Sequence, residues 1–161
     1  MNELSFDIKN SADFLNKLLE DYRDFCKDKL SSRIALNCAM TAWHITDWTY
    51  NEFNEQLTRQ FKTLGSYQQK LKDQCSSLQV MHDLANGTKH FKLTKHQPVI
   101  KGTSLHKGSF SNDFSRDFDI STLEIELKDG TKIYFEDEIE NTVKFWKEYL
   151  ETNFQIPIKK Q

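Results

Sequence analysis

The sequence of 161 residues has no long apolar run, little glycine or proline, and only three cysteines. No stretch approaches the roughly 20 apolar residues that a membrane-spanning helix needs, so we expect no membrane partner. Five glycines and two prolines exclude collagen-like and low-complexity chains, and twelve phenylalanines argue against disorder. An odd number of cysteines without a Cys-x-x-Cys spacing, and no signal peptide at Met1, predict a reduced, cytoplasmic protein. The length suits a single domain over residues 1–161.

Sequence signatures of common cofactors and catalytic centres are also absent. The chain has no Walker loop, no Gly-x-Gly-x-x-Gly, no Gly-x-Ser-x-Gly and no His-Glu-x-x-His. His44, His82 and His90 fall in predicted helices, but no pair has the His-x-x-x-His spacing that puts two ligands on one helical face. The sequence therefore predicts no metal site and no cofactor.

Charge is distributed unevenly along the chain, although the formal net charge is only −2. Residues 84–112 contain five lysines and three histidines but no aspartate or glutamate, whereas residues 113–161 contain 12 acidic and 7 basic residues. A basic stretch beside an acidic one either faces a polyanion or neutralises the acidic segment on folding. Both interpretations stay open at this point.

Apolar residues at three- and four-residue spacing predict four amphipathic helices. Asn10 or Ser11 offers an N-cap for the first helix, and Asn86-Gly87 suits the C-terminal end of the third. Continuation of the third helix through Gly87 also stays open, at a cost of about 1 kcal/mol. The expected helices span residues 11–30, 33 to the low sixties, about 67–87, and about 136 to the residues before Pro157.

The periodicity changes to two residues before the last helix. Leu123, Ile125 and Leu127 alternate with charged residues up to Asp129-Gly130, which predicts a hairpin with a type I′ turn. Val99–Lys101 is a further strand candidate. Because four amphipathic helices must bury their stripes against one another, we predict a mainly α fold. It is a four-helix bundle with a small antiparallel β-hairpin or sheet inserted at about residues 98–135, packed through its apolar face on the bundle.

The second predicted helix carries polar side chains among tryptophans. Trp43 and Trp48 flank His44, and Asp47 lies one turn from that histidine. An unpaired buried polar group costs about 1–3 kcal/mol, so we predict that His44 is buried and paired. One interpretation is a structural polar network of histidine and aspartate. The other is a polar pocket between helices, with His44 as a proton donor or ligand.

The end of the third predicted helix concentrates groups that suit an anion. Within eight residues it holds Asp83, Asn86, Lys89 and His90. One interpretation is a helix end followed by solvated side chains. The other is an anion site, in which Asn86 orients the ligand, Asp83 supports the network, and three lysines supply charge: Lys89, Lys92 and Lys95.

The segment from Asn86 to His90 resembles the motif of the HEPN superfamily, in which an arginine, usually a polar residue, a few variable positions and a histidine follow one another. Asn86 and His90 match the polar residue and the histidine, and Ala85 stands where the family has arginine. The resemblance covers residues 11–96 and the last helix. It implies a helical, often dimeric bundle that acts as a metal-independent ribonuclease in toxin–antitoxin or antiphage systems.

Two classes of function follow from these residues. In a ribonuclease or RNA-binding bundle, His90 is the general base on a ribose 2′-hydroxyl, Asn86 orients it, and Lys89 stabilises phosphorane charge. His44 completes the expected catalytic set, and a homodimer brings two motifs together. In a non-catalytic bundle that binds a protein partner, His44, Asp47 and Asn86 instead form a structural network.

Overall fold

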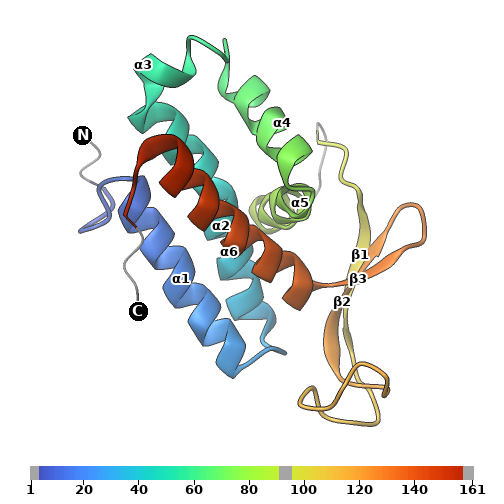
Figure 1. Cartoon of the computed structure of the whole chain (residues 1–161). Helices are drawn as coiled ribbons and strands as arrows, with labels where there is room; N and C mark the ends of the chain where they lie inside the picture. The colour runs from blue at the N-terminus through green and yellow to red at the C-terminus, as the bar shows by residue number, and fades with distance from the viewer. Residues whose placement is uncertain (1–3, 91–95, 158–161) are drawn as a thin grey trace.

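The computed structural model of the chain describes residues 4–90 and 96–157. Within these residues the protein is mainly helical and carries a small three-stranded antiparallel sheet before the last helix, as the sequence predicts (Figure 1). The helices are α1 Ser11–Lys27, α2 Ser32–Glu52, α3 Asn54–Leu57, α4 Leu64–Gln74, α5 Ser77–Lys89 and α6 Phe135–Phe154. The strands are β1 Ile100–His106, β2 Thr122–Leu127 and β3 Lys132–Tyr134.

Side-chain caps fix the starts of the first two helices. The carboxamide oxygen of Asn10 accepts a hydrogen bond from the backbone N–H of Asp13 at 2.8 Å, and Ser31 caps α2 in the same way through Ile34. These bonds satisfy N–H groups that have no partner inside the helix. Both starts agree with the predicted boundaries.

Two predicted helices are shorter than their apolar patterns suggest. The second ends at Glu52 rather than in the low sixties, because Phe53 leaves helical geometry and stacks on Phe154 with ring centroids 4.1 Å apart. The third is broken into α4 and α5 at Cys75, whose backbone is extended. The break turns α5 relative to α4, so that Tyr67 and Leu78 both reach the core (Figure 1). The helix then runs through Gly87 and ends at Lys89.

The core lies between the longer helices. α2 packs against α1 and α5, and α6 contacts all three of these helices. Figure 1 shows α1, α2 and α6 lying alongside one another, with α5 seen almost end-on. The fully buried indole of Trp146 on α6 donates its Nε1–H to the carbonyl oxygen of Ala42 on α2 at 3.0 Å. This bond fixes α6 against the middle of α2, the same part of the helix that carries His44.

The sheet has the order β1-β2-β3, and β2 is the central strand. Leu105 of β1 lies opposite Leu123, and Ile125 lies opposite Ile133 of β3. Ile125 is buried in the core while Leu123 and Leu127 pack against it, which confirms the predicted apolar face. β1 is longer than the predicted Val99–Lys101 segment because pairing with β2 carries it to His106.

The predicted hairpin turns at Asp129-Gly130, but with a different geometry. The N–H of Gly130 donates to the carbonyl of Leu127 at 3.0 Å, and the N–H of Leu127 donates to that of Thr131 at 2.8 Å. Gly130 alone in this turn has a positive φ, at 89°, where a type I′ turn needs two such residues. The turn is therefore a three-residue loop that requires glycine only at its last position.

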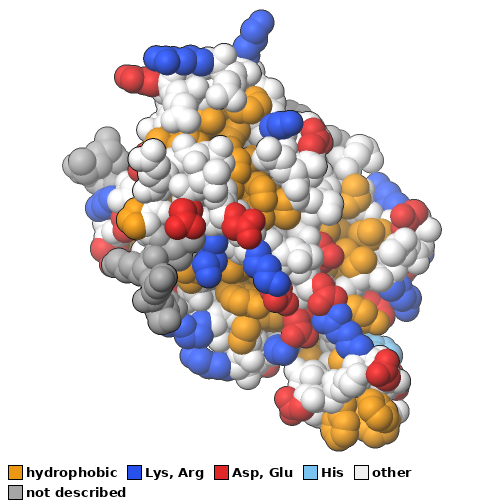
Figure 2. All heavy atoms as spheres, viewed as in Figure 1, with side chains coloured by type: hydrophobic (Ala, Val, Ile, Leu, Met, Phe, Trp, Pro, Cys, Tyr) orange, Lys and Arg blue, Asp and Glu red, His pale blue; other side chains and the backbone are white. Residues whose placement is uncertain are grey.

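The β1–β2 connection carries an apolar surface patch formed by Phe110, Phe114 and Phe118. Each is between 41% and 52% exposed, yet their rings lie only 5.1–5.9 Å apart between centroids. Hydrophobic side chains gather at this end of the molecule in Figure 2. None of the described helices is both long and apolar enough to cross a membrane.

Candidate functional site

A hollow between α2 and α5 brings together three of the residues singled out in the sequence. Its volume is about 360 Å³, and its lining includes His44 from α2 with Asn86 and Lys89 from α5. Because α2 and α5 pack side by side, residues 41 positions or more apart in the chain share this surface. The remaining lining residues are Met40, Trp43, Ala85 and Thr88. We call this surface the α2–α5 hollow.

The prediction that His44 is buried and paired is wrong. Its side chain is exposed, and Asp47 is exposed as well, accepting hydrogen bonds from the amide of Asn51 instead. No hydrogen bond joins His44 to Asp47 within the part of the chain that the structure describes. The reason is the direction of the helix: α2 turns Trp43 and Ile45 inward, which leaves the intervening histidine facing the hollow.

His44 is held in its neutral form. Partial desolvation in the hollow lowers its pKa, and the positive charges of Lys89 and Lys17 act in the same direction against an opposing effect of Asp47. Because the ordinary histidine pKa is already about 6.5, the imidazole is uncharged at pH 7. It therefore offers one N–H donor and one lone pair to a molecule in the hollow.

Lys89 supplies the positive charge of the hollow. Its side chain is exposed on the last turn of α5. The lysine ion pairs among residues 4–90 and 96–157 involve other lysines, so no described acidic group neutralises it. Lys92 and Lys95, predicted to act beside it, lie outside the described residues.

His90 does not join the lining of the hollow. It follows the last residue of α5, where its backbone N–H donates to the carbonyl of Asn86 at 3.0 Å, and its side chain is exposed. Ala85, at the position of the family arginine, is buried and presents only a methyl group to the hollow. The structure thus brings His44, Asn86 and Lys89 together, and leaves His90 and Asp47 outside the group.

Asp83 lies on a different face of α5 and is buried, with a side chain only 1% exposed. Its Oδ2 accepts hydrogen bonds from the backbone N–H groups of Val99 and Ile100 at 2.6 and 3.1 Å. Its Oδ1 lies 2.5 Å from Nε2 of His96 and accepts from the Gln79 amide at 2.8 Å. A buried carboxylate is stable only with such partners. Asp83 therefore fastens the chain entering β1 to the middle of α5.

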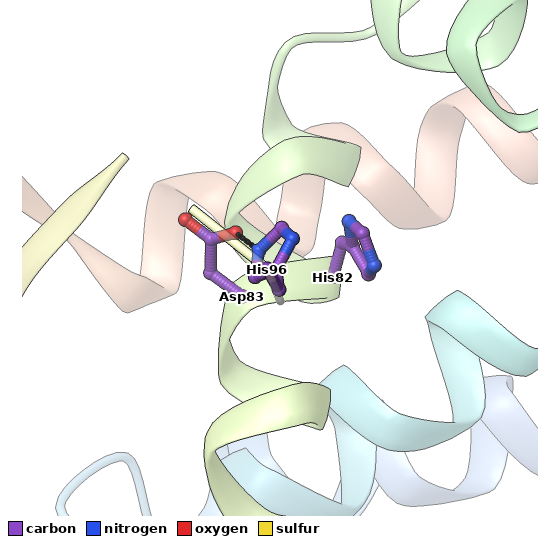
Figure 3. Close-up of side chains that lie close together, drawn as sticks. All are labelled: His82, Asp83 and His96. Atoms are coloured by element: carbon purple, nitrogen blue, oxygen red, sulfur yellow. Dashed lines mark hydrogen bonds and ion pairs between the residues drawn. The ribbon is translucent and has the colours of Figure 1, made fainter. Parts of the chain in front are cut away.

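His82, next to Asp83, is sandwiched between two other rings. It stacks on Trp43 with centroids 3.9 Å apart and planes 22° apart, and its centroid lies 4.3 Å from that of His96. Figure 3 shows the His96 side chain close to both Asp83 and His82. Burial, with the nearby His96 and Lys72, lowers the pKa of His82 to about 4 despite the opposing charge of Asp83. The imidazole is therefore neutral at pH 7, with one N–H donor and one lone pair.

The three side chains of His82, Asp83 and His96, which we call the His–Asp cluster, are the grouping that sequence analysis missed. One ligand atom from each lies within 4.8 Å of the other two. His82 and Asp83 are neighbours on α5, and His96 follows Asp83 by 13 residues, beyond the end of the helix. No helical spacing encodes this set, because it depends on His96, Val99 and Ile100 lying beside α5. The only signal in the sequence is the His82-Asp83 pair with a second histidine, His96, downstream.

Comparisons of the chain with protein-family models, with curated proteins and with solved structures found no match to any of them.

Proposed function

We propose that the α2–α5 hollow binds RNA through its phosphate groups. The observation that carries this proposal is Lys89, a cation with no described acidic partner, in the same hollow as His44 and Asn86. Lysine that is not neutralised by a neighbouring acid is a strong point charge for a phosphate oxygen. The volume of about 360 Å³ falls within the range of about 300–1,000 Å³ typical of ligand sites.

The three side chains divide the recognition of a phosphate between them. Lys89 supplies charge, the Asn86 amide donates a directed hydrogen bond, and the neutral imidazole of His44 donates another. Lys17 of α1, whose charge also reaches His44, is paired with Asp21 at 2.6 Å, so Lys89 remains the lysine of this face without a described acidic partner. A polyanion benefits more from this field than a neutral ligand does, because phosphate neutralisation releases condensed counterions.

The resemblance to the HEPN superfamily supports the same function. The four longer helices that contact one another, α1, α2, α5 and α6, are the elements that we propose as a HEPN-like four-helix bundle. In such a bundle the hollow would lie at the end of a core helix, where the family has its motif. Cleavage is not part of the proposal, because Ala85 replaces the arginine and His90 lies outside the hollow.

The proposal is tested by the salt dependence of RNA binding. Fluorescence anisotropy with a labelled single-stranded RNA, repeated over a series of salt concentrations, gives the slope of log affinity against log salt. Lys89→Ala should weaken binding and reduce this slope by about one, the loss of one phosphate contact. Lys62→Ala removes the same charge from the loop before α4, outside the hollow, and is the matched control.

Two outcomes would overturn the proposal. One is a folded wild-type protein that does not bind RNA at low salt. The other is an equal change of slope in Lys89→Ala and Lys62→Ala, which would mean that the hollow makes no particular contact. Salt-insensitive capture of a protein partner in place of RNA would favour the non-catalytic interaction bundle.

A further inference from the structure

We propose that the His–Asp cluster binds one transition-metal ion of the zinc class, with His82, Asp83 and His96 as its protein ligands. None of these three residues lines the α2–α5 hollow, which the site borders through Trp43, and the site does not depend on RNA binding. Two imidazoles and one carboxylate form a donor set that zinc uses in catalytic sites, where a water molecule takes the fourth position. The same set also suits other divalent first-row metals, so the ion is identified by class.

The distances within the cluster are close to those that a metal requires. Ligands 2.0–2.2 Å from a tetrahedral zinc ion are about 3.3–3.5 Å from one another. The potential ligand atoms of the three residues all lie within 4.8 Å of one another, and Asp83 Oδ1 and His96 Nε2 are at 2.5 Å. Metal binding therefore needs the carboxylate and His96 to separate by about 1 Å and His82 to approach by up to about 1.5 Å.

The neighbours of the cluster hold two of its ligands in position. Asp83 is fixed from behind by the N–H groups of Val99 and Ile100 on its other oxygen, and by Gln79. Trp43 packs flat against the His82 ring and restricts its rotation. Partners of this kind orient metal ligands in known sites, and removing one typically lowers metal affinity about 10–100-fold. These two side chains are therefore already ordered before a metal binds, and binding loses little of their conformational entropy.

His82 has a nitrogen that the rest of the fold leaves unused. Its Nδ1 is buried, and none of the described residues gives it a hydrogen bond. A buried nitrogen without a partner is unfavourable, and a metal ion is one group that would satisfy it.

The test uses Co²⁺ as a spectroscopic probe on the full chain after treatment with EDTA and removal of the chelator. Visible d–d absorption with one equivalent bound is the expected result for the wild-type protein. His82→Gln and His96→Gln should each weaken Co²⁺ binding by more than about 100-fold, since loss of a ligand exceeds loss of an outer partner. His106→Gln is the matched control, because it removes a histidine that is also bonded to an aspartate, Asp119, but on the surface.

The variants remain informative even if one of them folds poorly. Thermal unfolding without metal identifies any variant that has lost its structure, and addition of Zn²⁺ should raise the midpoint of the wild type but not of a folded His82→Gln protein. Unchanged binding in both ligand variants, or loss of binding in His106→Gln, would overturn the proposal. So would an intense near-ultraviolet charge-transfer band, which would mean that cysteine thiolates bind the ion. Since RNA binding is measured separately, its absence would leave this result unaffected.

Discussion

The two faces of α5 use similar residue types in opposite ways. On the α2–α5 hollow, Asn86 is half-buried, Lys89 is exposed, and no described acidic group pairs with the lysine. In the His–Asp cluster, Asp83 is almost fully buried, and both oxygens of its carboxylate have hydrogen-bond partners. Only one turn of helix separates Asp83 from Asn86. Asp83 and Lys89 are both charged residue types, so their different burial separates their roles.

This contrast separates residues that hold the fold from residues that are available to a ligand. A buried carboxylate without its partners is costly, and Asp83 therefore determines where the chain after residue 96 lies. An exposed lysine costs the fold little and keeps its charge for a partner. Mutations on the two faces should therefore differ in kind: stability should change on one face and binding on the other.

Trp43 belongs to both regions, and its removal should have the largest effect. The indole stacks on His82, lines the hollow, and is only 8% exposed. Trp43→Ala should lower the free energy of unfolding by about 3–5 kcal/mol through lost burial and the cavity left behind. Urea unfolding followed by circular dichroism measures this. Trp43→Phe keeps a ring against His82 and should lose less, and equal losses in the two variants would contradict the stacking contribution.

Replacement of Asp83 tests the buried face directly. Asp83→Ala should cost about 2–3 kcal/mol, because the N–H of Ile100 and the His96 ring lose a charged acceptor. Asp47→Ala is the matched control: the same change at an exposed position of α2 should stay within about 0.5 kcal/mol. The urea midpoints of the two variants give the comparison. Similar midpoints would show that Asp83 does not anchor β1.

Local signals in the sequence were enough to predict much of the fold. Asn10 caps the first helix as expected, and Leu123, Ile125 and Leu127 identify the buried face of β2. These features depend on residues close together in the chain. The break at Cys75 could not be predicted in this way, because the apolar spacing runs on through it. The break lets α5 contact both α2 and α6, while α4 contacts α2.

The sequence predicts the candidate site only where its residues lie on the same helix. Asn86 and Lys89 are within one turn of each other, and their shared face follows from helical geometry. The prediction for His44 failed because a helix between two others has both buried and open faces, and flanking tryptophans do not show which one a histidine occupies. His82 and His96 meet because residues 96–100 lie back alongside α5, for which the sequence has no periodic signal.

Among the replacements of Trp43, Asp83 and His44, that of His44 should have the smallest effect on stability. The side chain is exposed and none of the described residues gives it a hydrogen bond, so His44→Ala should change the free energy of unfolding by no more than about 0.5 kcal/mol. A loss of about 2 kcal/mol in urea unfolding would mean that the hollow is part of the structural core.

The effect of His44 should instead be seen in how RNA binding depends on pH. The pKa of His44 is lowered in the free protein, and a bound phosphate favours the charged imidazolium and raises that pKa. Affinity should therefore rise as the pH falls from about 7.5 to about 5.5, because the bound state takes up a proton that the free state does not hold. His44→Ala should lose this rise in anisotropy titrations, while His90→Ala, which removes an exposed imidazole outside the hollow, should keep it. If His90→Ala lost the pH dependence and His44→Ala kept it, the phosphate would lie at the end of α5 and not in the hollow.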